Sequence, residues 1–207
     1  MISNKYIGYI LKKVKECVNI MVKLNSELTI TMDTKSNIIG NFGVEQLDKQ
    51  GIMKDMLYNI LVTDDTDIAS RIVKNNNVIL WGNNAKGKYT IENTITLDNC
   101  IEILDSAVRS TGIKIVVLDK VLMRNDINST KDIVKLVKHI RVWAKKEGVT
   151  IISILNIASG IICRSYAKKG INSFKNFLNN FFSSIIQGFD YTILLGENNK
   201  VLMMNEL

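Results

Sequence analysis

The chain has 207 residues and a formal net charge of +7, and its composition is 46% hydrophobic and 23% charged. This composition is typical of a folded globular protein and excludes the disordered, collagen-like and disulfide-scaffold classes, because enough apolar side chains are present to bury a core. No apolar run approaches the roughly 20 residues needed to cross a bilayer, so we expect a cytoplasmic protein without a membrane partner.

The first half of the chain begins with a helical pattern and then alternates between strands and helices. Residues 4–24 repeat apolar side chains at every third or fourth position, which predicts an amphipathic helix. We assign residues 1–24 to this helix, packed on a domain that spans residues 25–207. The patterns that follow predict a strand at 28–32, a helix at about 40–57, a strand at 59–63, a short helix at 66–74 and a strand at 78–81.

Two nearly unbroken apolar runs dominate the second half. Residues 113–118 and 149–155 have the composition of strands that are buried on both faces, which predicts a central parallel sheet. Between them, residues 130–147 form the clearest helical pattern, with Gly148 as its stop signal. The remaining patterns predict helices at about 96–110 and 172–187, and strands at 191–195 and 201–204 that form a β-hairpin. The expected fold is a three-layer α/β domain with a mostly parallel sheet.

Candidate functional residues follow the predicted strands. In a parallel sheet, ligands bind beyond the carboxyl ends of the strands. There the sequence has Asp33 to Ser36, the pair Asp64 and Asp65, and Asp119. Carboxylates at such positions are suited to hold a metal or to orient water, and they also serve as ordinary helix caps, as we expect for Asp65 before the 66–74 helix.

These segments together resemble the core of RecA-like ATPases of the KaiC and RadA kind. The run LTITMDTKSNII stands where a strand and phosphate-binding loop would be, and NILVTDD resembles the strand that ends in an acidic pair. The run IKIVVLDKV is similar to a Walker B strand, and FDYTILLGENNKVLMM is similar to the closing hairpin. The resemblance covers about residues 25–205. It implies a RecA-like fold, an ancestral site for ATP and Mg²⁺, and assembly beside other subunits.

The first candidate phosphate-binding loop departs from the family pattern. A P-loop needs glycines so that backbone N–H groups wrap the phosphates, and it needs a Lys followed by Ser or Thr. Thr34, Lys35 and Ser36 retain the Lys-Ser pair, but the loop has no glycine and begins with Asp33. We therefore interpret Thr34, Lys35 and Ser36, with Asp64, Asp65 and Asp119, as a vestigial nucleotide site and expect no bound cofactor.

A second candidate loop spans residues 82–89. Its sequence GNNAKGKY fits the spacing of a P-loop up to Lys88 and fails at Tyr89, where Ser or Thr is required. The residues after it are β-branched, whereas a P-loop must open a helix. We interpret this segment as a hairpin turn rich in glycine and asparagine.

The 130–147 helix also has a basic arc. Lys131, Lys135, Lys138 and Lys145 cluster opposite its apolar face. This is the pattern of an ordinary solvated helix face, and a site for nucleic-acid phosphates is the alternative. The leading functional hypothesis is a non-catalytic or weakly nucleotide-binding RecA/KaiC-like protein that acts through protein partners or self-assembly. The alternatives are a nucleic-acid-binding accessory of recombination or repair, and an ATPase with an atypical P-loop.

Overall fold

The computed structural model describes residues 37–62, 67–82, 87–91, 99–123, 130–156, 176 and 187–206. The chain divides into two compact units, residues 1–36 and residues 37–207, and every described residue belongs to the second unit. The predicted helix at 4–24, the predicted strand at 28–32 and nearly all of the predicted helix at 172–187 lie outside the described residues.

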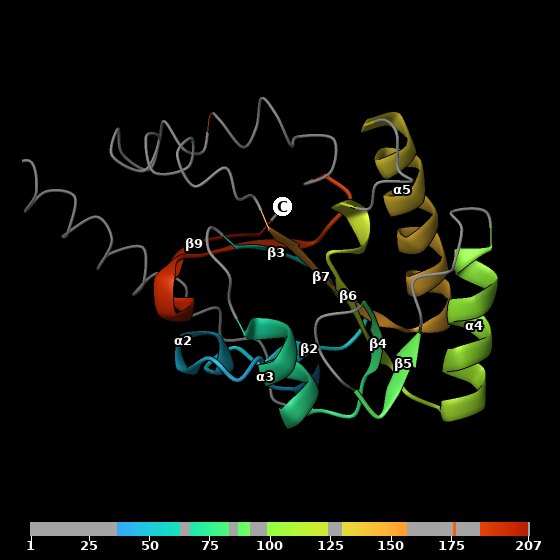
Figure 1. Cartoon of the computed structure of the whole chain (residues 1–207), viewed down its shortest axis with the longest axis horizontal. Coiled ribbons are helices and arrows are strands. Elements are labelled where there is room, and N and C mark those ends of the chain that lie inside the picture. Colours follow the sequence, from blue (N-terminus) through green and yellow to red (C-terminus); the bar gives the residue numbers. More distant parts are fainter. Residues whose placement is uncertain are drawn as a thin grey trace, which may run out of the picture. The chain divides into compact units, whose positions relative to one another are not determined.

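A seven-stranded sheet forms the centre of the second unit, with the strand order β5-β4-β6-β7-β3-β8-β9 (Figure 1). All neighbouring strands are parallel except β8 and β9, which pair antiparallel. The two apolar runs form β6 and β7 in the middle of the sheet, as predicted. The strands are β3 (Leu57–Val62), β4 (Ile79–Trp81), β5 (Tyr89–Ile91), β6 (Ile115–Asp119), β7 (Thr150–Asn156), β8 (Tyr191–Leu195) and β9 (Val201–Glu206).

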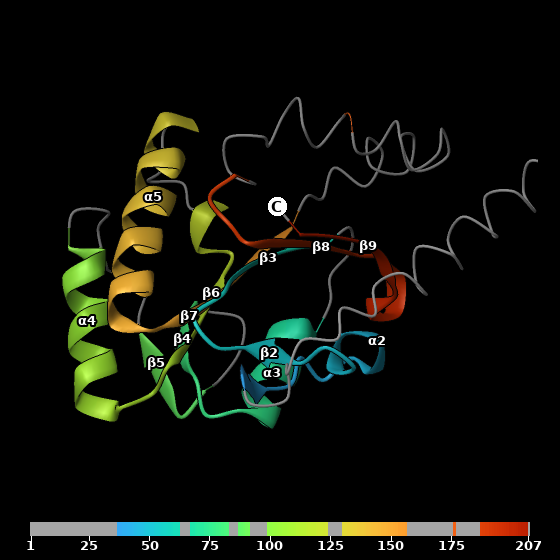
Figure 2. The same ribbon diagram turned by 180° about the vertical axis from the view of Figure 1, so that it is seen from behind.

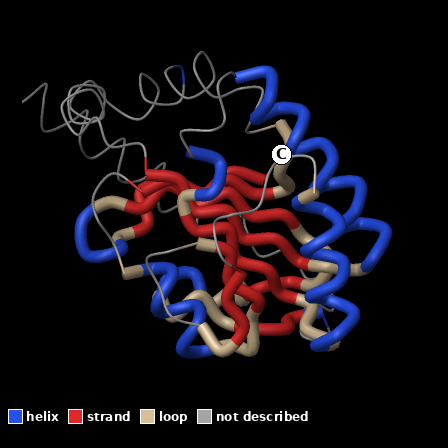
Figure 3. The backbone as a smooth tube through the Cα atoms, turned by 45° about the vertical axis from the view of Figure 1, so that its right-hand side comes forward, coloured by secondary structure: helices blue, strands red, loops and turns tan. Residues whose placement is uncertain are grey.

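Helices cover both faces of this sheet, so the predicted α/β class is confirmed (Figures 1 and 2). One face is covered by α4 (Cys100–Thr111) and α5 (Thr130–Glu147). The other is covered by α2 (Glu45–Asp48), by α3 (Ile68–Asn75) and by a small sheet of β1 (Ile38–Gly40) and β2 (Ile52–Met53). Short 3₁₀ turns follow β6, at Val121–Met123, and β8, at Glu197–Asn199. Figure 3 shows the strands between the two sets of helices.

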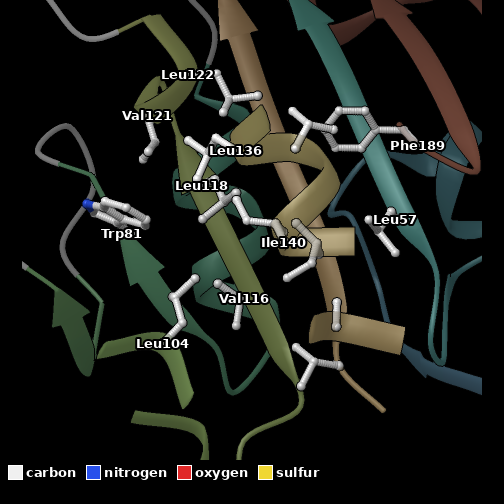
Figure 4. Close-up of a cluster of buried hydrophobic side chains, with 14 of the residues drawn as sticks. Leu57, Trp81, Leu104, Val116, Leu118, Val121, Leu122, Leu136, Ile140 and Phe189 are labelled. Atoms are coloured by element: carbon white, nitrogen blue, oxygen red, sulfur yellow. The ribbon is translucent and has the colours of Figure 1, made fainter. Parts of the chain in front are cut away.

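The strand sequences explain why two cores form. Successive side chains of a strand point to opposite faces, so a strand with apolar residues on both faces supplies both cores. In β3, Leu57 and Leu61 join the core under α4 and α5, whereas Ile60 joins the core under α3. Figure 4 shows the first of these cores, where Leu136 and Ile140 of α5 lie over the strands. Each such buried aliphatic side chain stabilises the fold by roughly 1.5–3 kcal/mol.

The helix predicted at 130–147 is present as α5 with the same bounds. Its end is set by Gly148, which has a φ of 63°, a conformation that residues with a Cβ rarely adopt. After this residue the Val149 N–H donates to the Ala144 carbonyl at 2.9 Å. Toward α4, the Trp143 indole N–H donates to the Asp105 carboxylate at 3.1 Å. No helix in the described part of the chain has both the length and the hydrophobicity required to span a membrane.

The helix predicted at 40–57 is wrong. This segment instead runs through β1, the four-residue helix α2 and β2, and then enters β3. Gly43 and Gly51 have φ values of 75° and 70°, and this left-handed conformation interrupts a helix on each side of α2. A Cβ on Gly51 would lie 2.6 Å from a methyl carbon of Ile38, so the β1–β2 pairing also requires a glycine there.

The hairpin turn predicted at residues 82–89 is also wrong, because β4 and β5 are parallel, with Ile79 opposite Tyr89. The chain must therefore return along the length of β4 before it enters β5.

Candidate functional site

The carboxyl ends of the parallel strands lie along one edge of the sheet, where the sequence predicted a site. In the described residues this edge includes Gly82 after β4, Asp119 at the end of β6, Asn156 at the end of β7 and Gly196 after β8. Of the six residues predicted to form a vestigial nucleotide site, only Asp119 is described. Thr34, Lys35, Ser36, Asp64 and Asp65 lie outside the described residues.

Asp119 is a buried carboxylate at the end of a central strand. It is 5% exposed, and its Oδ2 atom has no hydrogen-bond partner. Burial raises the pKa of Asp119, and the positive charge of the neighbouring Lys120 opposes that shift. The next peptide is held in place because the Lys120 N–H donates to the Ile154 carbonyl of β7 at 3.0 Å. The fold therefore leaves a buried carboxylate oxygen at this edge without a hydrogen-bond donor.

Gly82 packs directly against Asp119. A Cβ on Gly82 would lie 2.7 Å from the Asp119 carbonyl oxygen and 2.8 Å from the Asp119 Cβ, which is closer than such atoms can approach. Glycine is therefore required where the chain leaves β4 beside the end of β6. Close packing against Asp119 therefore explains why the GNNAKGKY segment begins with glycine.

The strand order reverses around β3, which has β7 on one side and β8 on the other. The chain leaves β3 toward β4 on the β7 side and later returns to pair β8 on the opposite side. Such a switch point is where open α/β sheets bind ligands. The connection that leaves β3 at this point leads into α3.

The residue before α3 is Asp67, in the N-cap position, so the cap is not Asp65 as predicted. Asp67 makes no side-chain capping bond. Its Oδ1 atom accepts hydrogen bonds from Arg71 Nε at 2.7 Å and from Asn199 Nδ2 at 2.8 Å. These bonds, led by the one from Arg71, lower the pKa of Asp67. A carboxylate therefore already occupies the start of this helix.

The GNNAKGKY segment lacks the features of a phosphate-binding loop at its described end. Tyr89 begins β5, so the loop opens a strand and not a helix. The Gly87 N–H donates to the Thr90 hydroxyl at 3.2 Å, and the hydroxyl donates to the Gly87 carbonyl at 3.1 Å. The Lys88 ammonium lies 5.3 Å from the centre of the Tyr89 ring, within reach of a cation–π contact.

The basic arc divides into two parts. Lys131, Lys135 and Lys138 are exposed on α5. Lys145, by contrast, donates from its ammonium to the Asp190 carboxylate at 2.8 Å and to the Asp55 carbonyl at 2.6 Å. The charge of Lys145 is therefore committed to holding the end of α5, whereas the first three lysines form no ion pair with any residue that the structure describes.

A polar row inside the sheet was missed by sequence analysis. Asn59 of β3 lies in register with Ser153 of β7 and with Thr192 of β8, and all three are buried. Their side-chain oxygen atoms and the amide nitrogen of Asn59 have no hydrogen-bond partner. Each is a single polar residue within an apolar run, but only the strand register brings them together.

Within the described residues, no group of three or more His, Cys, Asp or Glu side chains could hold a metal ion. No family model matches the sequence, and the comparison with curated proteins gives no match. The resemblance to KaiC-like and RadA-like ATPases therefore stays a prediction.

Proposed function

We propose that this chain is a RecA/KaiC-like domain that does not hydrolyse ATP and acts by binding protein partners or by self-assembly. The observation that carries the proposal is the composition of the connection at the switch point. Residues 63–67, between β3 and α3, are Thr-Asp-Asp-Thr-Asp. This connection leads from a strand of the sheet into a helix, as a phosphate-binding loop does, but it contains neither glycine nor lysine and so cannot replace the altered loop at residues 33–37.

Charge repulsion supports the loss of phosphate binding at this connection. Asp64, Asp65 and Asp67 carry three carboxylates within five residues. Two like charges about 4 Å apart repel by about 1 kcal/mol even in water, and more where water is excluded. The N-terminus of a helix attracts anions, but at α3 the carboxylate of Asp67 already lies beside it. A triphosphate at this connection would therefore meet carboxylates and would find neither the glycines nor the lysine of a P-loop.

The character of Asp119 supports the same proposal. A carboxylate that helps to hold Mg²⁺ must be ionised, and burial makes ionisation of Asp119 less favourable. Mg²⁺ in nucleotide sites is also shared with substrate phosphates, which the β3–α3 connection disfavours. The strand order, with β8 and β9 joined antiparallel at the end, supports the RecA-like resemblance on which the proposal rests.

Isothermal titration calorimetry of the full chain with ATP, with and without Mg²⁺, tests this proposal. We expect an affinity no tighter than about millimolar, which is about −4 kcal/mol, and no phosphate release above background. Lys35→Ala and Lys88→Ala are the matched variants, since each removes the lysine of one loop that resembles a P-loop. Neither substitution should change the titration.

Two results would contradict the proposal. Micromolar, Mg²⁺-dependent binding that Lys35→Ala abolishes would show that residues 33–37 form a working variant of the loop. The same loss in Lys88→Ala would assign the activity to residues 82–88. In either case the protein would be an ATPase or a nucleotide-dependent switch.

A further inference from the structure

The outward face of α5 carries a stripe of four exposed residues, Lys131, Lys135, Lys138 and Val142, which we call the outward stripe. Their spacing of four, three and four residues places them along one line of the helix. Val142 is 71% exposed, the largest exposure among the described large hydrophobic residues. Lys138 and Lys146 lie one turn before and one turn after it.

Among the described residues, no carboxylate pairs with the lysines of the outward stripe. Lys131, Lys135 and Lys138 form no ion pair with any described residue. The carboxylate of Glu147, at the end of α5, instead forms ion pairs with Arg109 at 3.8 Å and with Lys146 at 3.7 Å. Lysines three and four residues apart on one helix repel each other, so their clustering does not stabilise the fold.

Val142 discriminates between classes of partner. A nucleic-acid backbone pairs with lysines but has no apolar group to cover an exposed valine. A protein interface combines an apolar centre with a charged rim, and complementary charges direct the partner to it. The spacing of four and three residues is also the spacing at which one helix contacts another along a shared seam.

We propose that the outward stripe binds an acidic amphipathic helix of a protein partner, with Val142 in the apolar centre and the lysines pairing with carboxylates. This inference rests on the proposed function, because it names the kind of partner through which a non-hydrolysing domain would act. Lys145 marks the limit of the surface, since its ammonium is held by Asp190.

The test uses the full chain and a labelled synthetic helical peptide with Glu at the complementary spacing and one Leu opposite Val142. A scrambled peptide of the same composition and a DNA duplex serve as competing probes, and binding is measured by fluorescence anisotropy. The first variant combines Lys131→Glu, Lys135→Glu and Lys138→Glu. Its control combines Lys49→Glu, Lys54→Glu and Lys74→Glu, three exposed lysines outside α5 that give the same change in net charge.

We expect the stripe variant to weaken peptide binding at least about tenfold and the control variant to change it less than about threefold. Val142→Ser should weaken peptide binding about tenfold, because an apolar contact is lost, and should leave DNA binding unchanged. Circular dichroism of each variant checks that the fold is retained.

Three outcomes would overturn the proposal. Equal losses in the stripe and control variants would show that only net charge matters. If DNA, but not the peptide, depends on the three lysines, the stripe is a nucleic-acid surface. If the peptide and its scrambled form bind equally or not at all, the stripe is a solvated face. The peptide measurement does not involve ATP hydrolysis. A negative result would therefore not contradict the proposal that the protein does not hydrolyse ATP.

Discussion

At the scale of single residues, the polar row of Ser153, Asn59 and Thr192 is the main departure from an apolar sheet core. These side chains are 0%, 0% and 1% exposed. A buried polar atom without a partner costs about 1–3 kcal/mol, because it has lost its hydrogen bonds to water. The row therefore lowers the free energy of unfolding, and the three strands are stable in spite of it.

Thr192→Val should stabilise the protein by about 1 kcal/mol, because valine has the same shape and removes the unpaired hydroxyl. Thr150 of β7 is the matched control, since it is also buried but its hydroxyl donates to the Met53 carbonyl at 3.0 Å. Thr150→Val should destabilise the protein by about 1 kcal/mol. Urea unfolding at pH 7 measures both changes. A loss of stability in both variants would show that the Thr192 hydroxyl is also hydrogen-bonded.

Asp119 leads to a prediction about pH. Burial raises its pKa in the folded state, so the folded protein binds this proton more tightly than the unfolded chain does. Stability is therefore lost as the pH rises from the ordinary carboxyl pKa of about 3.9 through the raised value. Asp119→Asn removes the buried charge and should increase the free energy of unfolding by about 1 kcal/mol at pH 7.

The gain from Asp119→Asn should shrink as the pH falls through the raised pKa of Asp119, and it should be smallest below about pH 4, where Asp119 is protonated in both states. Urea unfolding of both proteins across this pH range measures the difference. A loss of stability at pH 7 would instead indicate that the carboxylate is paired with a cation in solution.

At the scale of elements, α5 is fixed to the sheet by one carboxylate at its C-terminal half. Asp190 accepts from Arg141 at 2.9 Å and from Lys145 at 2.8 Å, and the Leu57 N–H of β3 donates to it at 2.9 Å. Burial alone would raise the pKa of Asp190, but the hydrogen bond from Lys145 and the other partners outweigh burial and lower it. One side chain thus joins α5, β3 and the start of β8.

Asp190→Ala should reduce the free energy of unfolding by about 2 kcal/mol at pH 7, because two cations and a backbone donor lose their acceptor. The pKa of Asp190 is lowered in the folded state, so its contribution is present above the unfolded value and is lost as the pH falls through the folded value. The difference between variant and wild type should therefore narrow below about pH 4.

Arg71→Gln is the control for this measurement. It breaks the exposed pair with Asp67, in which the two side chains are 47% and 57% exposed, and it should cause no measurable change. If Asp190→Ala also leaves the free energy of unfolding unchanged, the contacts of Asp190 do not hold α5 in solution.

At the scale of the whole described domain, the two cores share one sheet. The strands β3, β6, β7 and β8 contribute residues to both faces, so neither core can open without exposing the other side of the same backbone. We therefore expect one cooperative unfolding transition for the two cores.

Ile72→Val tests this coupling. Ile72 lies in the core under α3. Both tryptophans of the chain, Trp81 and Trp143, lie in the core under α4 and α5. The substitution should reduce stability by about 1 kcal/mol. The midpoint by tryptophan fluorescence should shift by the same amount as the midpoint by far-UV circular dichroism. A shift in the circular dichroism alone would show that the two cores unfold separately.

Local patterns determined several elements of this protein. The runs at 113–118 and 149–155 are apolar at most positions, interrupted by Lys114 in the first and by Thr150 and Ser153 in the second, so they need cover on both faces and must lie inside a parallel sheet. The 130–147 helix is fixed by its 3.6-residue period and by Gly148. Signals of this kind act between neighbours in sequence, and the structure retains them as β6, β7 and α5.

Only the tertiary structure decided which distant residues meet. The parallel pairing of β4 with β5, the contact of Gly82 with Asp119 and the register of Asn59 with Ser153 and Thr192 all depend on strand order, which no local pattern encodes. The segment 40–57 looked helical because its apolar residues suit that period, but Gly43 and Gly51 adopt left-handed conformations that pack β1 and β2 beside α3. The sequence by itself determined which segments must be buried. The contacts between those segments decided which residues meet at the carboxyl edge of the sheet, where the strand order switches, and which buried polar groups lack a partner.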